Sequence, residues 1–134
     1  MAGAGRSWVE AVAAKDHDAV RALLAPDVDF RALTPGRPWE ASTSDAVLEI
    51  VFGHWFEDQE EVVALLAVDG GDPVEDVQRV GYRFAMRTPD GDFTVEQQAY
   101  FRTSDGLITH LRVLCSGFRP SAPRATSEGD PSTP

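Results

Sequence analysis

Apolar residues in the first part of the chain recur at the spacing of two short helices. Residues 8–13 and residues 19–24 each carry valine, leucine or tryptophan along one stripe. Asp16 lies between the two stripes, where its carboxylate can cap the second helix by accepting a backbone N–H. Pro26 follows soon after and ends that helix, because proline has no N–H to donate. The pattern therefore predicts two consecutive helices.

A strand and a third helix come next. Residues 28–32 alternate apolar and charged side chains, which is the period of a half-buried strand, and the Pro- and Gly-containing residues 34–38 interrupt this pattern as a loop. Residues 42–45 resemble a capping box, and the apolar stripe after them extends to His54 and Trp55. This stripe predicts a helix whose core-facing side includes His54.

The second half of the chain has only strand patterns. Residues 62–68 form a continuous apolar run, which is typical of a strand covered on both faces. Three longer runs follow and alternate apolar with polar residues. The turns "PDG" and "SDG" separate them, and both suit hairpin connections. These runs cover residues 77–87, 93–102 and 107–115.

Alternation assigns each residue of these three strands to one face of the sheet. The arginines of the first two strands fall on the outer face, together with Ile108, His110, Arg112 and Leu114 of the third. Runs of helices followed by runs of strands indicate an α+β domain, here one curved antiparallel sheet with three N-terminal helices on its concave side. The inward-facing set is Val80, Tyr82, Phe84 and Met86; Phe93, Val95, Gln97, Ala99 and Phe101; and Leu107, Thr109, Leu111, Val113 and Cys115.

These elements occupy residues 6–118, which is one domain of a 134-residue chain. Residues 1–5 are expected to be a flexible N-terminus. Residues 119–134 contain proline, serine, threonine, glycine and charged residues, and no apolar residue larger than alanine. Such a composition buries too little apolar surface to offset the entropy of ordering, so we expect a disordered tail.

The net charge of -10 and its distribution disfavour several partners. No lysine or arginine lies between Arg37 and Arg79, whereas acidic residues crowd residues 57–76. Phosphate contacts need clustered basic residues, and no stretch approaches the ~20 apolar residues of a membrane span. We therefore expect neither nucleic acid nor a membrane as a partner, and we interpret the acidic segment as solvated surface.

The single cysteine, Cys115, excludes an internal disulfide, and the histidines have no zinc-type spacing. The N-terminus also lacks the apolar run of a signal peptide. These features predict a soluble, unexported protein of the cytoplasm, with no metal and no cofactor.

Three segments resemble the nuclear transport factor 2-like superfamily, in particular its SnoaL-like and ketosteroid isomerase-like members. They are "WVEAVAAKDHDAVRALLAPDVDF", "SDAVLEIVFGHWF" after the Pro/Gly loop, and "VEQQAYFRTSDGLITHLRVL" at the closing hairpin. The resemblance implies a cone-shaped α+β half-barrel whose open end holds an apolar pocket, often in a homodimer formed through the outer sheet face. The superfamily includes isomerases, cyclases, hydratases, epoxide hydrolases and proteins that only bind.

The chain departs from the catalytic patterns of that superfamily. Ketosteroid isomerases use an aspartate base and an oxyanion hole made of a tyrosine and a protonated aspartate. The resemblance places Trp8, Ala32 and Ala99 at these three positions. Tryptophan donates a hydrogen bond but does not ionise, and alanine does neither, so this proton-shuttling chemistry is not expected. The Asp, Arg, Asp set of the epoxide hydrolase-like members is also missing, because alternation turns the arginines outward.

The inward-facing and rim residues form the candidate ligand-binding set. His54 is the candidate general base, since a reference pKa near ~6.5 suits chemistry at neutral pH, and a histidine hydrogen-bonded at a helix edge is the alternative. Gln97 is the polar member of an apolar set and serves either ligand recognition or a structural hydrogen bond. A packed aromatic core is the alternative to a pocket. The set is Trp8, Phe30, Trp39, His54, Trp55, Tyr82, Phe84, Gln97, Phe101, Val113 and Cys115.

Cys115 has three conceivable roles: nucleophile, redox sensor or pocket wall. A reactive thiolate needs a nearby cation or a helix N-terminus to lower its pKa. The inward face of this strand is apolar, with only His54 as a conceivable cation. We therefore expect Cys115 to behave as a small pocket-lining side chain.

Three functions stay open at this stage. The first is binding of a small apolar molecule. The second is an isomerase, cyclase or dehydratase that uses His54 with Asp29, Glu40 or another carboxylate, and the third is a dimeric interaction module with a filled cavity. A histidine within reach of a carboxylate in a wet cavity favours the enzyme, and a dry apolar cavity favours the binder. Alternating polar and aromatic groups on the outer face, including Tyr100, predict a homodimer.

Overall fold

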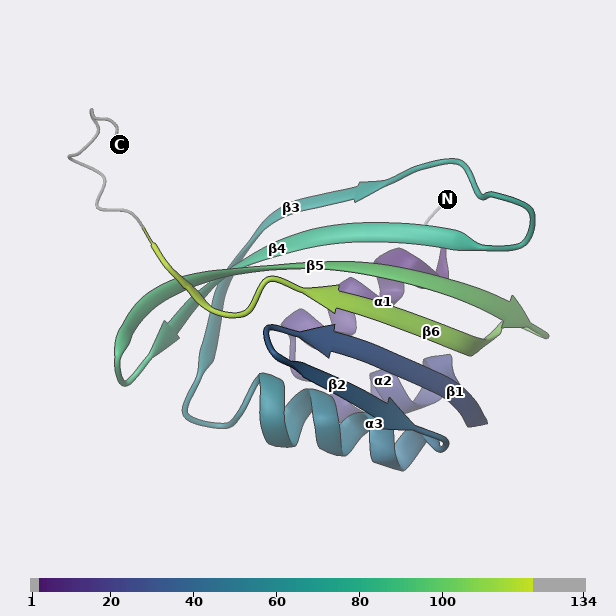
Figure 1. Cartoon of the computed structure of the whole chain (residues 1–134), viewed down its shortest axis with the longest axis horizontal. Helices are drawn as coiled ribbons and strands as arrows, with labels where there is room; N and C mark the ends of the chain where they lie inside the picture. The colour runs from purple at the N-terminus through teal and green to yellow at the C-terminus, as the bar shows by residue number, and fades with distance from the viewer. Residues whose placement is uncertain (1–2, 122–134) are drawn as a thin grey trace.

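Three helices pack against one face of a curved sheet in the computed structural model, which describes residues 3–121 (Figure 1). The strand order is β2-β1-β6-β5-β4-β3, and β7 pairs with β5 off this path. In chain order the elements are α1 (Ala4–Ala13), α2 (His17–Leu23), β1 (Leu24–Thr34), β2 (Arg37–Ala41), α3 (Ser44–Ile50), the π-helix η1 (Val51–Trp55), β3 (Glu61–Gly70), β4 (Gln78–Thr88), β5 (Gly91–Ser104), β6 (Leu107–Cys115) and β7 (Arg119–Pro120).

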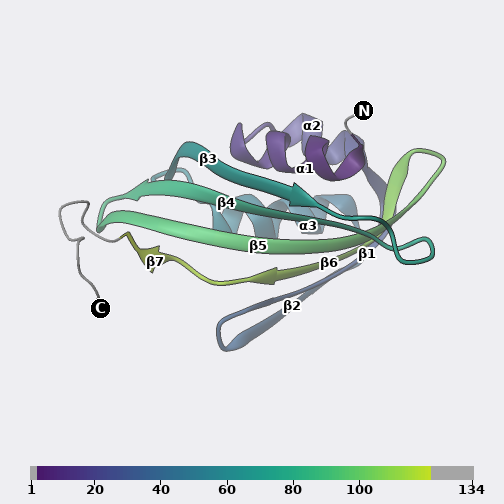
Figure 2. The same cartoon turned by 90° about the horizontal axis from the view of Figure 1, so that it is seen from above.

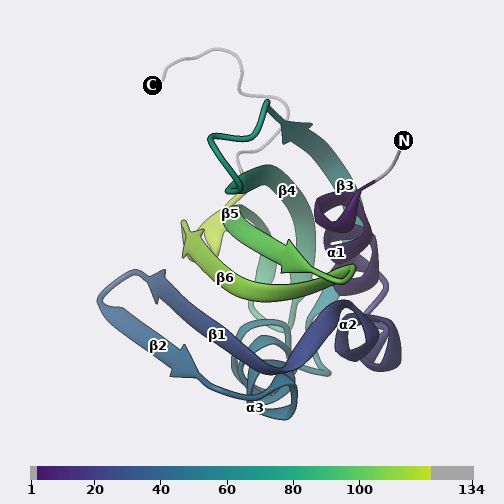
Figure 3. The same ribbon diagram turned by 90° about the vertical axis from the view of Figure 1, so that its right-hand side faces the viewer.

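The predicted α+β architecture is confirmed, with one pairing that differs from an all-antiparallel sheet. Strand β1 pairs with β6 in parallel, while the long strands β3 to β6 pair antiparallel with their neighbours. Figure 2 shows α1 and α2 on one side of the sheet, and Figure 3 shows the sheet curling around the helices without closing. The sheet is therefore mixed and open, as in a half-barrel.

Side chains cap two of the helices. The Asp16 carboxylate accepts the Ala19 N–H at the start of α2, as predicted. At α3 the capping residue is Thr43, whose hydroxyl accepts the Ala46 N–H, so the predicted capping box at Ser42 lies one residue too early. Helix α1 packs closely on the sheet because Gly5 has no side chain: a Cβ there would lie 3.1 Å from both Phe101 and Val80.

The Pro/Gly segment after β1 is a hairpin turn instead of a longer loop. Strand β2 pairs antiparallel with β1 from Arg37 to Ala41, and Gly36 takes a positive φ of 76° in the turn. The sequence prediction of a break through Pro38 was wrong because proline is tolerated on an edge strand, where no N–H is required on the outer side. This hairpin supplies one wall of the site described below.

Strand β3 is an edge strand, so the prediction of a strand covered on both faces was wrong. Two register irregularities interrupt its pairing with β4, and Val63 and Leu66 lie 46% and 52% exposed at these positions. A second irregularity lies between β5 and β6, where Arg102 pairs with His110 and Thr103 with Ile108. It turns Ile108 into the core, contrary to simple alternation, whereas Leu111 and Val113 face inward as predicted.

The predicted domain limits shift at both ends. Helix α1 begins at Ala4, inside the segment 1–5 that was expected to be flexible. Residues 119–121 are part of the fold, because Arg119 and Pro120 pair with Thr94 and Phe93 of β5. The remainder of the predicted tail lies outside the described residues.

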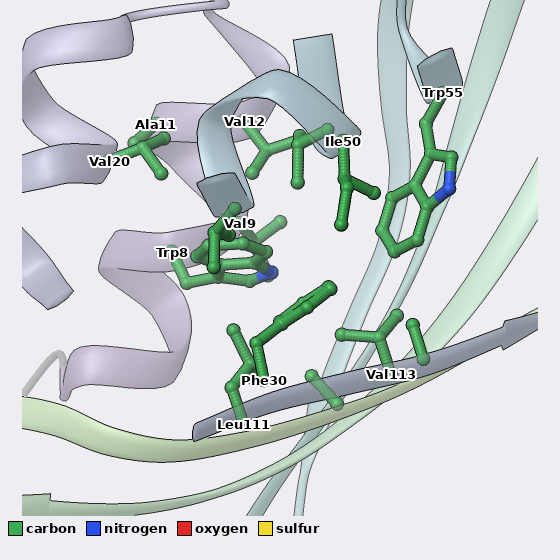
Figure 4. Close-up of a cluster of buried hydrophobic side chains, with 14 of the residues drawn as sticks. Trp8, Val9, Ala11, Val12, Val20, Phe30, Ile50, Trp55, Leu111 and Val113 are labelled. Atoms are coloured by element: carbon green, nitrogen blue, oxygen red, sulfur yellow. The ribbon is translucent and has the colours of Figure 1, made fainter. Parts of the chain in front are cut away.

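The core lies between the helices and the concave face of the sheet. Figure 4 shows Trp8 and Val9 of α1 against Phe30 and Leu111 of the sheet, with Trp55 at the edge of this cluster. The predicted inward residues of β4, from Val80 to Met86, are buried, as are Val95, Ala99 and Phe101 of β5. Among residues 3–121 no helix has the length and apolarity needed to cross a membrane.

Candidate ligand pocket

Three polar side chains form a hydrogen-bonded chain inside the core. The Trp8 indole Nε1–H donates to the Tyr82 hydroxyl at 2.9 Å, and that hydroxyl donates to Gln97 Oε1 at 2.6 Å. Helix α1 supplies Trp8, while β4 and β5 place Tyr82 and Gln97 directly opposite each other in the ladder. All three side chains are buried. We call this set the Trp8–Tyr82–Gln97 relay.

The direction of the relay follows from the chemistry of its ends. An indole N–H can only donate, so the Tyr82 oxygen accepts from Trp8 and its own proton goes to Gln97. Burial raises the pKa of the Tyr82 phenol well above its usual value, outweighing the opposite effect of the Trp8 hydrogen bond. Tyr82 therefore stays protonated at neutral pH, and the Gln97 amide nitrogen is left facing away from the relay.

Gln97 also lines a cavity of about 220 Å³. Its walls come from the β1–β2 hairpin, from η1 and the residues after it, from β5, and from the end of β6 with the residues that follow it. Because Gln97 is shared, the relay ends at this cavity. The lining residues are Thr34, Trp39, His54, Trp55, Phe56, Glu60, Gln97, Cys115, Gly117 and Phe118.

Two buried N–H groups at this cavity have no partner among residues 3–121. They are Gln97 Nε2, in a side chain 1% exposed, and Trp55 Nε1, in a side chain 6% exposed. In Figure 4 the Trp55 nitrogen lies on the side of the ring away from the labelled core side chains. Buried polar groups in folded proteins nearly always have a partner, and leaving one without costs about 1–3 kcal/mol. Two side chains that line the cavity thus each carry a buried N–H group for which residues 3–121 supply no acceptor.

Trp39 forms the aromatic side of the cavity mouth. Its indole Nε1–H donates to the Thr34 hydroxyl at 2.8 Å, which fixes the ring on the hairpin. The His54 ring lies 5.2 Å from it, centroid to centroid, and the Trp55 ring meets it edge-on at 6.2 Å. The Arg37 guanidinium covers the Trp39 ring at 3.6 Å from its centroid.

Two backbone features hold the remaining walls in place. Lys15 donates from Nζ to the backbone carbonyl oxygens of Glu57 and Glu60, which ties the segment after η1 to the turn between α1 and α2. On the opposite side Gly117 has a φ of +76°, and a Cβ there would lie 2.8 Å from Pro35 Cγ. The end of β6 therefore packs directly on the β1–β2 turn.

His54 is exposed at the rim, and the prediction that it faces the core was wrong. The chain changes from α-helix to π-helix at Val51, which alters the angle between successive residues and turns His54 outward while Trp55 stays buried. No hydrogen bond joins His54 to a carboxylate within residues 3–121. The carboxylate of Asp29 faces Arg112 at 3.3 Å, and Glu40 is exposed on β2.

Glu60 is the acidic residue that shares the cavity with His54. Its carboxylate accepts the Glu57 backbone N–H at 3.0 Å. The arrangement that would favour acid–base chemistry, a histidine hydrogen-bonded to a carboxylate, is therefore not formed by the described side chains.

Cys115 is half-buried at the cavity wall. Its Sγ accepts the Gly117 backbone N–H at 3.3 Å, and its strand register places it directly opposite Gln97. No lysine or arginine is among the residues that line this cavity. The thiol therefore packs as a wall residue beside the relay.

The structure divides the predicted site residues into two groups. Trp39, His54, Trp55, Gln97 and Cys115 line the cavity. The residues Trp8, Phe30, Tyr82, Phe84, Phe101 and Val113 are buried in the core behind it. Sequence reasoning missed Thr34, Phe56, Glu60, Gly117 and Phe118. Glycine followed by phenylalanine directly after the last long strand was the available signal for two of them.

A larger hollow of about 540 Å³ lies on the outer sheet face. It is open to the surface, and the only carboxylate among its described lining residues is paired: Arg83 donates to Glu96 at 2.9 Å, and the neutral Gln98 amide donates to the same carboxylate at 3.2 Å. Unlike the inner cavity, it contains no buried donor without a partner within the described residues. We therefore assign the candidate site to the inner cavity.

The fold defines a class of protein, the cone-shaped α+β domains whose curved sheet does not close into a barrel. The sequence of residues 6–111 matches the SnoaL-like domain, and the chain belongs to that family. A search of curated proteins finds no match. No group of three or more histidine, cysteine, aspartate or glutamate side chains suited to a metal ion occurs within residues 3–121.

Solved structures support the same fold assignment. A candidate isomerase from Bacillus subtilis superposes with a TM-score of 0.70 at 13% identity, covering 84% of each chain. A candidate polyketide cyclase from Xanthomonas campestris gives 0.65 at 20% identity, covering 83% of this chain and 86% of the other. An epoxide hydrolase from M. tuberculosis gives 0.61 at 16% identity, covering 84% and 80%. At such identities the likeness concerns the fold, and these proteins differ in reaction.

Proposed function

We propose that this protein binds a small, largely apolar molecule that carries a hydrogen-bond-accepting oxygen. The observation that carries the proposal is the pair of buried donors without partners, Gln97 Nε2 and Trp55 Nε1, at one cavity. A ketone, ester or ether oxygen would satisfy such donors, whereas a pure hydrocarbon would leave both unpaired. The aromatic rings of Trp39, Phe56 and Phe118 would contact the apolar body of the ligand.

The cavity volume sets the size of the ligand. About 220 Å³ is below the 300–1,000 Å³ typical of sites for drug-sized ligands, so a bicyclic molecule is an appropriate probe. Indanone and indane have the same fused-ring skeleton and differ by one carbonyl oxygen. Calorimetry should show that wild-type protein binds indanone about ten-fold more tightly than indane, as one to two neutral hydrogen bonds would give.

Neighbouring glutamines on β5 provide a matched pair of variants. Gln97→Met keeps the length of the side chain and removes its donor, so the preference for indanone over indane should fall to what the Trp55 donor alone gives. Gln98→Met makes the same change on the outer face, and the preference should survive. Equal affinity of wild-type protein for indanone and indane would reject the proposed function.

A reaction at the same cavity is the second candidate, and it is favoured by the presence of both His54 and Glu60 among the lining residues. An isomerase, cyclase or dehydratase would use them as proton acceptor and donor around the bound oxygen. If His54 is the base, His54→Gln should lower any turnover by roughly 10²-fold. Unchanged turnover would leave His54 as a rim residue of a binding site.

We also propose that two copies associate through the outer sheet face. Tyr100 is 37% exposed there, and Leu33 and Leu114 are also exposed large apolar residues. Sedimentation at micromolar concentration should give twice the monomer mass, and Tyr100→Glu should shift the protein toward monomer because it places a charge in the interface. A strictly monomeric wild type would reject the dimer without affecting the cavity.

A further inference from the structure

We propose that Trp8 and Tyr82 are positioning residues that make the cavity select ligands with a hydrogen-bond acceptor over ligands with a donor. This inference rests on the proposed binding function. Neither residue lines the cavity; both act through Gln97, which does. Trp8 and Tyr82 therefore affect ligand specificity by orienting Gln97.

A glutamine amide needs such control because its two ends have nearly the same shape. One end accepts hydrogen bonds and the other donates them, and a half-turn about the last bond exchanges the two. An unrestrained glutamine could offer either atom to a ligand and would discriminate poorly. At Gln97, Oε1 receives the Tyr82 hydroxyl proton at 2.6 Å, and Nε2 is left for the cavity.

The reversed orientation of the Gln97 amide would leave the Tyr82 hydroxyl proton without an acceptor. If Nε2 faced Tyr82, the tyrosine oxygen would receive N–H groups from both Trp8 and Gln97. Its own proton would then have no acceptor, because the neighbouring Trp8 Nε1–H cannot accept one. When a ligand acceptor pairs with Nε2, only the reversed amide still leaves the Tyr82 hydroxyl proton unpaired, at a cost of about 1–3 kcal/mol, so the observed orientation is favoured in the complex by roughly ten-fold to a hundred-fold. Tryptophan at position 8 thus fixes which atom Gln97 shows to the ligand.

The consequence for a ligand is a preference set by polarity at constant shape. An acceptor pairs with Gln97 Nε2 and relieves an unpaired buried donor. A ligand N–H or O–H placed at the same position would face another donor, and both groups would stay unsatisfied. Indanone, indole and indane are fused bicyclic molecules that carry an acceptor, a donor and neither, so they separate polarity from shape.

Calorimetry with these three ligands on wild-type protein and on Tyr82→Phe tests the proposal. Wild type should favour indanone over indole by about ten-fold or more. The phenylalanine variant keeps the ring and removes the hydroxyl, so Gln97 can present either atom, and the preference should fall several-fold through both weaker indanone and tighter indole binding. The affinity for indane should change little and shows that the cavity keeps its shape.

An unchanged preference in Tyr82→Phe, with indanone still bound by the wild type, would overturn the role of the relay and leave the proposed function intact. Proton NMR of the wild type tests the relay without any ligand. A strong nuclear Overhauser effect is expected between the Tyr82 hydroxyl proton and the Trp8 indole N–H proton. A strong effect between that hydroxyl proton and the Gln97 NH₂ protons would instead show the reversed amide and refute the inference, even if the variant does not fold.

Discussion

The glutamines Gln97 and Gln98 lie on opposite faces of the sheet, and their side-chain amides differ in hydrogen bonding. On the outer face both ends of the Gln98 amide are paired: Oε1 accepts from Arg79 at 2.9 Å and Nε2 donates to Glu96 at 3.2 Å. On the concave face Gln97 has one end paired with Tyr82 and the other unpaired at the cavity. Solvent could satisfy Gln98 in any case, whereas Gln97 is buried.

The difference shows where polar groups are costly. An exposed network on the outer face gains little, since its partners compete with water. A polar group without a partner inside the core costs the full desolvation penalty. Such a group is therefore expected mainly at functional sites. We interpret the unpaired donors of the concave face as the part of the molecule shaped for a ligand. Substitutions on the two faces should therefore differ in size and in kind.

The largest difference is expected between neighbours on β4. Phe84 is fully buried and its ring packs against Tyr82 and Phe56, so Phe84→Ala should cost about 3–5 kcal/mol of unfolding free energy. Arg83 points outward to Glu96, and Arg83→Ala should cost less than about 1 kcal/mol. Urea unfolding of the two variants measures both values. Comparable costs would mean that the outer face is not solvated.

Two glycines with the same backbone angle test the packing at the cavity mouth. Gly36 and Gly117 both have a φ of +76°, but only Gly117 would place a Cβ against Pro35. Gly36→Ala should cost about 1 kcal/mol for the left-handed conformation, and Gly117→Ala should cost about 2 kcal/mol or more because crowding adds to it. Thermal melts and indanone binding compare them, and only Gly117→Ala should also weaken binding.

The two tyrosines of the chain provide a test by pH. Burial raises the folded-state pKa of Tyr82, so above the unfolded value of about 10 the unfolded chain releases a proton that the folded protein retains. The stability contribution of Tyr82 is complete below that pH and is lost progressively as the pH rises. Tyr82→Phe should flatten this alkaline decline, while Tyr100→Phe, on the outer face, should retain it. Unfolding curves of the two variants, recorded between neutral and alkaline pH, measure this difference.

The smallest effect is expected at Glu96. Hydrogen bonds from Arg83 and Gln98 lower its pKa in the folded state. Its contribution is therefore present above the unfolded value of about 4.3 and is lost as the pH falls through the folded value. Glu96→Gln should cost less than about 1 kcal/mol at pH 7, and the cost should shrink at acid pH and in high salt. A pH-independent difference would point to packing instead of charge.

Alternation along the strands was sufficient to predict the interior of the molecule. Tyr82 and Gln97 face inward from β4 and β5 because the ladder between these strands is regular over its length. The same rule failed at Ile108, where a local irregularity shifts the alternation by one residue. Periodicity alone contains no signal for such a shift.

The remaining errors arise from features other than the alternation of apolar residues. The exposure of His54 depends on a change of helix type, and the exposure of β3 depends on its place at the edge of the sheet. Neither is encoded in the local alternation of apolar residues. The lining residues Phe118 and Gly117 follow the last long strand, and only their packing against the β1–β2 turn brings Gly117 to the cavity wall.

The central claim is that Gln97 and Trp55 are unpaired donors reserved for a ligand oxygen. Nitrogen–proton NMR spectra of ¹⁵N-labelled protein, recorded during an indanone titration, test it most directly. The Gln97 NH₂ and Trp55 indole N–H signals should move downfield together as the carbonyl binds, while the Gln98 NH₂ signals stay in place and indane, which has no acceptor, gives no such joint downfield shift. Saturable indanone binding that leaves the Gln97 and Trp55 signals unmoved would contradict the account.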